Sequence, residues 1–338
     1  MNFVFTDEQR MMASAFRELA EDIRSTPAWH RIAEMQITGA LVPEAAGGLG
    51  LSDADVILIA EEAGYADLQE PWVEHSFIAV PMLAELTDGS GTAQEGLRAA
   101  ATGAIRIAIE HPINPFVLAA AEADYLLLTR DDQIHLVERF RAQLTHIPSI
   151  DTGRRLCRVD ASLSDSTLVA SGTGAHEVLR HAFERGALFC AAQLLGVCHR
   201  MIELAVAYAR EREQFGKPIG SYQAIKHALA SAQVKLEFAR PVVYRASTCI
   251  EAAESSLRAQ VAISHAKLAA TDAADFAART AIQVHGAMGY SWEVDLHRFM
   301  KRAWALAGTW GDRSFHARRV SSAVLGGRLA LGPGGTFD

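Results

Sequence analysis

Residues 210–226 read REREQFGKPIGSYQAIK and join two long stretches of helix-forming residues. Charged and polar residues lead into Phe215, and Gly216, Pro218 and Gly220 follow before the helical pattern returns. Glycine and proline favour turns, because glycine accepts a positive φ and proline fixes a negative one. This stretch therefore predicts a turn between two helices that displays an arginine, a glutamine and an aromatic ring.

Helical patterns extend from this turn in both directions. Apolar residues recur at helical spacing with few helix breakers, and the connections between the patterns are short. The patterned stretches cover residues 177–213, 221–254, 256–286 and 312–325. Long helices with short connections predict an antiparallel four-helix bundle. We expect this bundle to span residues 174–330 and to be followed by a flexible tail at 331–338.

The preceding residues divide into a helical and a β-like stretch. In residues 1–100, Thr6 precedes two acidic residues, which suits a helix start, and Asp53 is a plausible cap for a second helix. Residues 101–173 contain short, often alternating apolar runs separated by turn-like segments. They predict a small antiparallel β domain. The fold class is therefore mainly α with a small β domain.

Composition narrows the class of partner. Half of the residues are hydrophobic, 21% are charged, and the net charge of −8 comes from interspersed rather than clustered residues. This pattern argues against nucleic acid or an anionic membrane as the main partner. The N-terminal stretch MNFVFTDEQRMM does not resemble a secretory signal, and no apolar run approaches the ~20 residues of a membrane span.

The cysteines show neither paired spacing nor a spacing to histidine that suits zinc. They are Cys157, Cys190, Cys198 and Cys249. We expect a cytoplasmic protein with reduced thiols and no metal, no membrane contact and no nucleic acid.

Four motifs occur in the order found in a known family. They are TDEQR at 6–10, VPEAAGGLGLS at 42–52, AREREQFGKPIGSYQAIKHALA at 209–230 and IQVHGAMGY at 282–290. In these motifs and in its layout the chain resembles the acyl-CoA dehydrogenases, which have an N-terminal helical domain, a middle β domain and a C-terminal four-helix bundle. The resemblance implies FAD as cofactor and removal of two hydrogens from the Cα–Cβ bond of an acyl-CoA thioester by a carboxylate base and the flavin.

The resemblance assigns cofactor contacts to the opening stretch. Arg212 would bind the FAD pyrophosphate, because a guanidinium stays charged and forks onto phosphate oxygens. Gln214 would add a hydrogen bond and Phe215 a flat apolar face near the adenine, while Tyr222 and Gln223 begin a helix whose amides favour an anion. The alternative is that Arg212 pairs with a neighbouring glutamate on a solvated face and that Phe215 fills a core.

A second FAD segment is implied near the end of the third bundle helix, reached in these enzymes from a neighbouring subunit. It comprises Gln283, Val284, His285, Gly286 and Ala287. Gly286 fits a helix end where backbone approaches a ligand. A plain helix C-cap is the alternative.

The catalytic base of the family has no counterpart here. Trp310 stands at the usual glutamate position, and Gly186 stands where some members carry the base on the first bundle helix. The nearest carboxylates are Asp312, two residues after the first position, and Glu184, two residues before the second. We expect Glu184, beside Arg185 at a helix start, to be a solvated charge.

The flavin-ring motif of the middle domain, T-E-P-x-x-G-S-D, is also absent, and HPINP at 111–115 stands near its place. This combination resembles the short subunits of heteromeric acyl-CoA dehydrogenases in bacterial steroid side-chain catabolism. The resemblance implies an α2β2 assembly in which a larger partner supplies the base and this chain contacts FAD across the interface. The open alternatives are a self-sufficient homo-oligomer that uses Glu184 or Asp312, and a flavin-free scaffold.

Overall fold

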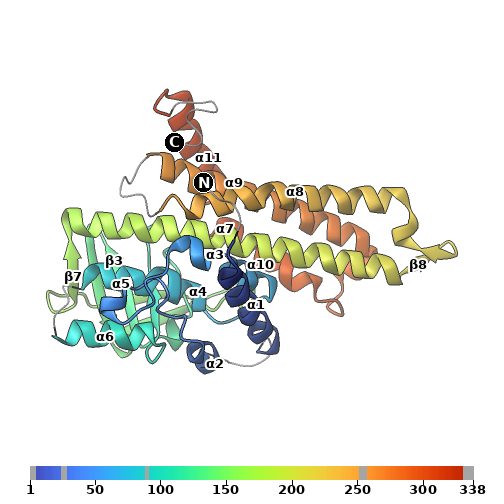
Figure 1. Ribbon diagram of the computed structural model, residues 1–338. Helices are drawn as coiled ribbons and strands as arrows, with labels where there is room; N and C mark the ends of the chain where they lie inside the picture. Colours follow the sequence, from blue (N-terminus) through green and yellow to red (C-terminus); the bar gives the residue numbers. More distant parts are fainter. Residues whose placement is uncertain (1–4, 24–28, 88–90, 251–256, 330–338) are drawn as a thin grey trace. The chain divides into compact units, whose positions relative to one another are not determined.

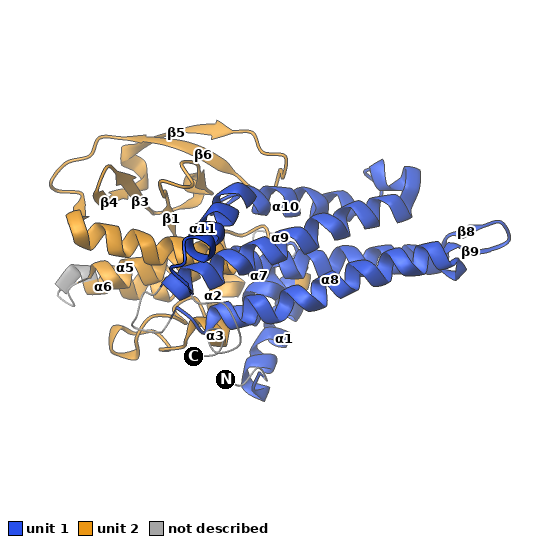
Figure 2. Ribbon diagram, turned by 90° about the horizontal axis from the view of Figure 1, so that it is seen from above, with its two compact units in different colours: residues 1–20, 57–67, 190–338 blue, residues 21–56, 68–189 orange. Residues whose placement is uncertain are grey.

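The computed structural model describes residues 5–23, 29–87, 91–250 and 257–329, so the predicted tail at 331–338 lies outside the described residues. The chain forms two compact units, coloured separately in Figure 2. Unit 1 comprises Met1–Ala20, Ile57–Asp67 and Cys190–Asp338, and unit 2 comprises Glu21–Val56 and Leu68–Phe189. Both units are discontinuous along the chain, so they divide it differently from the predicted domain boundaries, which stay a prediction.

Helices dominate the chain, as predicted. They are α1 (Asp7–Asp22), α2 (Trp29–Glu34), α3 (Asp53–Tyr65), α4 (Trp72–Glu74), α5 (Val80–Leu86), α6 (Gly91–Ala101), α7 (Gly172–Glu211), α8 (Gln223–Ser247), α9 (Leu257–His285), α10 (Leu296–Gly308) and α11 (Arg313–Leu325). The stretches predicted for the C-terminal bundle correspond to α7, α8, α9 and α11. Helix α10 was not among them.

Unit 1 is built on long helices that lie side by side. The C-terminal part of α7 runs along α8, and α8 packs against α9 (Figure 1). Helices α3 and α7 cross at backbone contact, because a Cβ at Gly64 would lie 2.1 Å from the Gln193 carbonyl oxygen and one at Gly196 would lie 1.9 Å from that of Glu61. These glycines are therefore packing positions, where any side chain would clash.

Capping confirms the first predicted helix start and corrects the second. At α1, the Gln9 backbone amide donates to Thr6 Oγ1 at 3.2 Å, and the Thr6 amide donates to Gln9 Oε1 at 2.8 Å. Such reciprocal bonds are a capping box. At α3, the Asp55 amide donates to Ser52 Oγ at 3.2 Å, so Ser52 caps the helix and the expectation for Asp53 was wrong.

Unit 2 contains two small sheets. The strands are β1 (Ile107–Ile109), β2 (Val117–Leu118), β3 (Tyr125–Arg130), β4 (Gln133–Glu138), β5 (Ala142–Ile147), β6 (Leu156–Ala161) and β7 (Leu168–Ser171). One sheet has the order β1-β3-β4-β7 and the other β2-β6-β5. The sheets are not purely antiparallel as expected, because β1 pairs with β3 in parallel, with Ile107 opposite Tyr125. Their shared core includes Val117, Leu126 and Val137.

The four cysteines are free, and three of them are buried. Among the described residues, α7 is one helix long and apolar enough to cross a membrane by length and composition, and 72% of its most apolar window is buried inside the protein. Core helices pass the same test, so this is weak evidence for a membrane span.

Candidate functional site

The opening stretch forms a hairpin arm at the end of α7 and α8. Strands β8 (Glu213–Gln214) and β9 (Lys217–Pro218) pair antiparallel, with Gln214 opposite Lys217. Between them, Phe215 and Gly216 have φ values of 54° and 78°. Two successive positive φ values are typical of a type I′ turn, which matches the twist of the flanking strands. Figure 1 shows the hairpin at one end of unit 1.

Phe215 points into solvent on this arm. Its side chain is 92% exposed, which excludes the alternative of a core plug within the described residues. The Tyr222 hydroxyl lies 3.2 Å from the Gln214 carbonyl oxygen, to which it donates, and the Tyr222 ring lies edge-on to Phe215 at 6.4 Å. Lys217 Nζ lies 4.4 Å from the centre of the Tyr222 ring. The Tyr222 side chain therefore supports the arm.

Arg212 lies at the base of the arm with its side chain exposed. Its backbone amide donates to the Tyr208 carbonyl at 2.8 Å, and its carbonyl accepts from the Ile219 amide at 2.8 Å. These bonds fix the backbone. Within the described part of the chain, the guanidinium forms no ion pair with Glu211 or Glu213, so the alternative pairing is not formed.

The other predicted polar residues of the arm are also at the surface. The Gln214 side-chain amide donates to the Glu213 carbonyl at 2.7 Å, which is a local bond. Gln223 is exposed and is the first residue of α8, after Tyr222 at the cap position.

The second predicted segment meets the same end of unit 1. Helix α9 ends at His285, whose ring stacks on Tyr208 with centroids 4.4 Å apart. Tyr208 also accepts the Arg212 amide, so the structure brings both predicted cofactor segments together. They differ in exposure: Gln283, Gly286 and Ala287 are exposed, while Val284 and His285 are buried.

His285 is part of the helix packing. Its Nδ1 donates to the Ala281 carbonyl at 2.8 Å, and burial lowers the pKa of the ring. A buried neutral imidazole bonded to its own helix is a packing residue. Side-chain contact with a ligand is therefore open to Gln283, and backbone contact to Gly286 and Ala287.

Trp310 occupies the loop between α10 and α11. Its side chain is 3% exposed and its φ is 56°. Its carbonyl accepts a hydrogen bond from His316 Nε2 at 2.9 Å, so the proton is on Nε2 and His316 Nδ1 accepts from Ser264 Oγ at 3.1 Å. Burial lowers the pKa of His316 to about 4, which keeps the ring neutral. Gly311 follows at φ 91°, and a Cβ there would lie 2.7 Å from the His316 ring.

The two carboxylates that were alternatives for the base, Asp312 and Glu184, lie in different surroundings. Asp312 caps α11, with Oδ1 accepting from the Phe315 amide at 2.7 Å. Glu184 is 4% exposed in the interior of the 40-residue α7, so the expectation of a solvated charge at a helix start was wrong. Its neighbour Arg185 is half-buried and donates to Asp53 Oδ1 at 3.2 Å and Glu85 Oε1 at 2.9 Å. Gly186 lies on the same helix.

The HPINP segment forms a closed turn in unit 2. His111 bridges Asn114 through backbone bonds, its Nε2 donates to the Leu179 carbonyl at 3.0 Å, and its Nδ1 accepts from the Ile113 amide at 3.2 Å. Burial lowers the pKa of His111 to about 4. The imidazole is therefore fully committed to structure, and the segment offers no hydroxyl or carboxylate to a ring.

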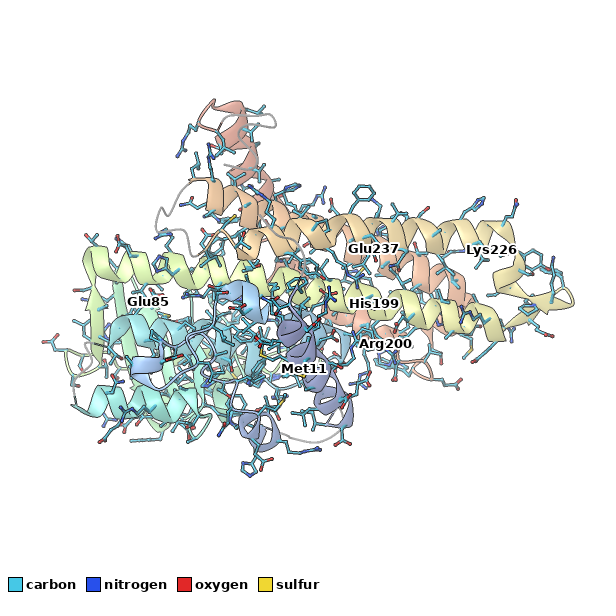
Figure 3. All side chains as sticks on the ribbon, in the orientation of Figure 1. Met11, Glu85, His199, Arg200, Lys226 and Glu237 are labelled. Carbon is cyan, nitrogen blue, oxygen red and sulfur yellow. The ribbon has the colours of Figure 1, made fainter. Side chains whose placement is uncertain are left out.

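Sequence reasoning missed a charged network around Tyr65 in unit 1. Arg17 and Arg200 lie over the Tyr65 ring at 4.5 and 5.3 Å, Arg17 bonds both Glu62 oxygens, and Tyr65 donates to Glu203. Figure 3 shows Arg200 and its neighbour His199 on α7. The partners come from three helices far apart in sequence, so no local pattern could have identified them.

The exposed aromatics after α9 were also missed as site candidates. Tyr290 is 80% exposed and Trp292 74%, and Lys301 Nζ lies 3.9 Å from the centre of the Trp292 ring. Tyr290 is the last residue of the IQVHGAMGY motif, and this motif could have identified it as a site candidate. Trp292 had none.

Sequence profiles match both helical regions. Residues 6–90 match the N-terminal domain of acyl-CoA dehydrogenases, and residues 172–325 match their C-terminal domain. The acyl-CoA dehydrogenase IpdE2 of Mycobacterium tuberculosis is 30% identical over 297 residues, covering 88% of this chain and 86% of the relative. The chain belongs to the acyl-CoA dehydrogenase family.

Other similarities agree with membership in this oxidoreductase family. The acyl-CoA dehydrogenase FadE34 of Mycobacterium tuberculosis is 30% identical over 325 residues, covering 90% of this chain but 43% of FadE34. Among solved structures, the ChsE4–ChsE5 complex from Mycobacterium tuberculosis is similar with a TM-score of 0.81 and 20% identity, covering 96% of this chain and 99% of the matched one. The acyl-CoA dehydrogenase fold predicted from the motifs is therefore confirmed.

Proposed function

We propose that this chain is a subunit of a heteromeric, FAD-dependent acyl-CoA dehydrogenase. In this proposal it contacts FAD across a subunit interface, while a larger partner supplies the catalytic base. The carrying observation is the contrast between an exposed Arg212 and a buried Trp310: the chain offers a cation for the cofactor and an indole where its family has a carboxylate.

The arm fits the pyrophosphate end of FAD. Arg212 has a fixed backbone and a guanidinium without an ion pair in the described part of the chain, so binding a phosphate breaks no existing bond. Phe215 offers an exposed apolar face, and Gln283 a side-chain amide at the end of α9 that lies beside α7. Together these residues offer a cation, an aromatic face and an amide, which suit the phosphates and the adenine of a dinucleotide.

The flavin-ring end does not fit this chain. The turn at 111–115 has its histidine committed to Leu179 and Ile113 and carries no serine, threonine or acid. Holding the ring is therefore assigned to the partner. FAD, when bound, supplies hydride acceptance for α,β-dehydrogenation of the thioester.

The remaining roles follow from the chain's own side chains. With FAD bound, Arg212 would neutralise the pyrophosphate charge, and Phe215 would exclude water from one face of the nucleotide. The Trp310 side chain is buried within the chain. It cannot take a proton from a substrate carbon, because an indole has an N–H donor and no proton acceptor. Asp312 stays a helix cap, and neither it nor Glu184 acts as a base.

Two comparisons support a partner. This chain matches 43% of FadE34, so more than half of FadE34 lies outside the match. That remaining length is large enough to correspond to a second subunit. The similar structure with ChsE4 and ChsE5 is a complex of these two proteins. We further propose a bulky acyl-CoA thioester, such as a steroid side-chain thioester, as substrate, because an assembly without half of the active sites leaves room for it.

The test is purification of the chain alone and together with its partner from the native cell. We expect the chain alone to lack acyl-CoA-dependent flavin bleaching, and the complex to bind FAD and bleach. In the complex, Arg212→Ala should reduce FAD affinity by about 10- to 100-fold, the range expected for one charge-assisted contact. Arg210→Ala, two residues away and also exposed, is the matched control and should retain FAD.

Three outcomes would contradict the proposal. A yellow, active homo-oligomer of this chain would show that it carries its own base. Unchanged FAD content in the Arg212→Ala complex would favour a flavin-free scaffold role. Equal FAD loss in the Arg210→Ala complex would show that Arg212 has no specific role. A turnover preference for short straight-chain thioesters would remove the substrate assignment alone.

A further inference from the structure

The last turn of α7 contacts both predicted cofactor segments. Tyr208 lies in this turn, and Arg212 directly follows the end of the helix. The Arg212 amide donates to the Tyr208 carbonyl at 2.8 Å, which continues the hydrogen bonding of the helix by one residue. Residues four positions apart on a helix lie on the same face. Tyr208 and Arg212 are therefore neighbours on one face of α7.

The hairpin arm is joined to this turn through its backbone. The Arg212 carbonyl accepts from the Ile219 amide at 2.8 Å. Gly220 comes next, and a Cβ there would lie 2.8 Å from the Ala209 carbonyl oxygen, so the chain before α8 touches the backbone of α7. Main-chain contacts therefore hold the base of the arm in place.

The end of α9 is joined to the same turn by a ring contact. The His285 ring stacks on the Tyr208 ring with centroids 4.4 Å apart and planes inclined by 22°. His285 Nδ1 donates to the Ala281 carbonyl at 2.8 Å, which fixes the plane of the imidazole. The link between α7 and the end of α9 therefore depends on two side chains that can be substituted.

The turn that follows His285 is packed closely against it. This turn spans Gly286–Tyr290, and a Cβ at Gly289 would lie 3.2 Å from His285 Cβ. Gly286 and Ala287, at the start of the turn, are exposed. A shift of the His285 ring would therefore also shift the exposed backbone of these two residues.

We propose that Tyr208 and His285 are a positioning pair for the cofactor. Their stack sets the spacing between Arg212 and the Gly286–Ala287 backbone, so that both contact one FAD molecule. Two linked contacts strengthen binding only where their spacing matches the ligand. The two rings act through these contacts and not by touching the cofactor. This inference rests on the proposed function, because it needs FAD at Arg212.

The test measures the dissociation constant of FAD for the assembled complex by serial dilution, from the fluorescence of the released FAD. We expect Tyr208→Ala to weaken FAD binding by about 3- to 10-fold, the range that corresponds to one aromatic contact. Tyr208→Phe keeps the stacked ring and should stay within about 2-fold of the wild type. Tyr208→Leu, which keeps the bulk without the flat ring, replaces the alanine variant if circular dichroism shows that the latter is unfolded.

A double substitution distinguishes positioning from packing. Arg212→Ala removes one of the two contacts, so their spacing no longer matters. In this background we expect Tyr208→Ala to change FAD affinity by less than about 2-fold, whereas independent effects would multiply. A stack that only stabilises the fold would leave FAD affinity unchanged in the Tyr208→Ala complex, and this result overturns the proposal. An equal effect of Tyr208→Ala in both backgrounds also overturns it.

His199 provides a matched control on the same helix. Its ring lies 5.3 Å from that of Tyr65, in a second tyrosine–histidine pair, about 18 Å before the end of α7. His199→Ala should retain FAD affinity, and a loss as large as that of Tyr208→Ala overturns the proposal.

The positioning role and the proposed function fail in different ways. If Arg212→Ala leaves FAD affinity unchanged, the proposed function is wrong, and the positioning role is wrong with it. If Arg212→Ala weakens FAD binding and Tyr208→Ala does not, only the positioning role is wrong.

Discussion

Two aromatic–glycine pairs in unit 1 share positive φ values but differ in the burial of the aromatic ring. Phe215 and Gly216 have φ values of 54° and 78°, and Trp310 and Gly311 have 56° and 91°. The phenylalanine is 92% exposed and the tryptophan 3%. A left-handed non-glycine residue costs of the order of 1–3 kcal/mol and persists only where its surroundings compensate.

The compensation differs between the two pairs. Around Trp310, burial of the indole and the hydrogen bond from His316 hold the backbone. At Phe215, the pairing of the two short hairpin strands holds the backbone. The ring itself is not buried against the described residues. An exposed aromatic ring held at a hairpin tip supports the proposal that Phe215 contacts a ligand or a partner. Backbone geometry alone therefore does not distinguish a buried tryptophan in a loop from an exposed phenylalanine at a hairpin tip.

Removing the buried ring should have the largest effect. We expect Trp310→Ala to lower the free energy of unfolding of the chain by about 3–5 kcal/mol, because it leaves a cavity and keeps an unfavourable φ. Urea denaturation of the free chain measures this. Phe215→Ala is the control from the exposed pair, and a loss of similar size in both would contradict the comparison.

The pH dependence of stability should report on the support of Trp310. His316 has a folded-state pKa of about 4 against an ordinary value of 6.5, caused first by burial. The unfolded chain therefore binds one more proton between these values, so its stabilising contribution is complete above pH 6.5 and is lost as pH falls towards 4.

The slope of the free energy of unfolding against pH in that window should contain up to about 1.4 kcal/mol per pH unit from His316. His75 and His111 in unit 2 have pKa values of about 4 as well and add to it. A His316→Gln chain should be less stable at neutral pH and should have a shallower slope. An unchanged slope would show that the imidazole is not buried as described.

A substitution of Asp312 tests the proposal that this chain has no catalytic base of its own. Because its side chain caps α11, Asp312→Ala should cost about 1 kcal/mol of stability. Turnover of the assembled complex should be unchanged. Loss of turnover in an Asp312→Asn variant, which can still cap the helix, would revive Asp312 as a base.

The smallest effect on stability is expected at the exposed pair. Phe215→Gly should change the free energy of unfolding by only about 0.5 kcal/mol, because the ring packs against little of the described chain and the relief of the left-handed φ is offset by the greater freedom of glycine in the unfolded chain. In the complex, the same substitution should weaken FAD binding, and Phe215→Tyr should restore it. Unchanged FAD affinity in Phe215→Gly would assign the tip to partner contact instead.

Much of the fold was predictable because local signals carry it. The Thr6 capping box, the helical periodicity of α7–α9 and the turn at Gly216–Gly220 each depend on residues close in sequence, and all are present in the structure. The parallel pairing of β1 with β3 was not predictable in this way, because strand pairing joins segments without a local signature.

The features of the candidate site also separate into those set by local sequence and those set by tertiary packing. The sequence by itself determined the family, the absence of a carboxylate at positions 186 and 310, and the arm that carries Arg212, because these are matters of residue identity and order. Only the tertiary structure decided that Glu184 is buried, that Arg212 is unpaired with its glutamate neighbours, and that Phe215 and Trp310 face opposite environments. Burial and pairing depend on which distant segments pack around a side chain, and a linear pattern does not contain that information.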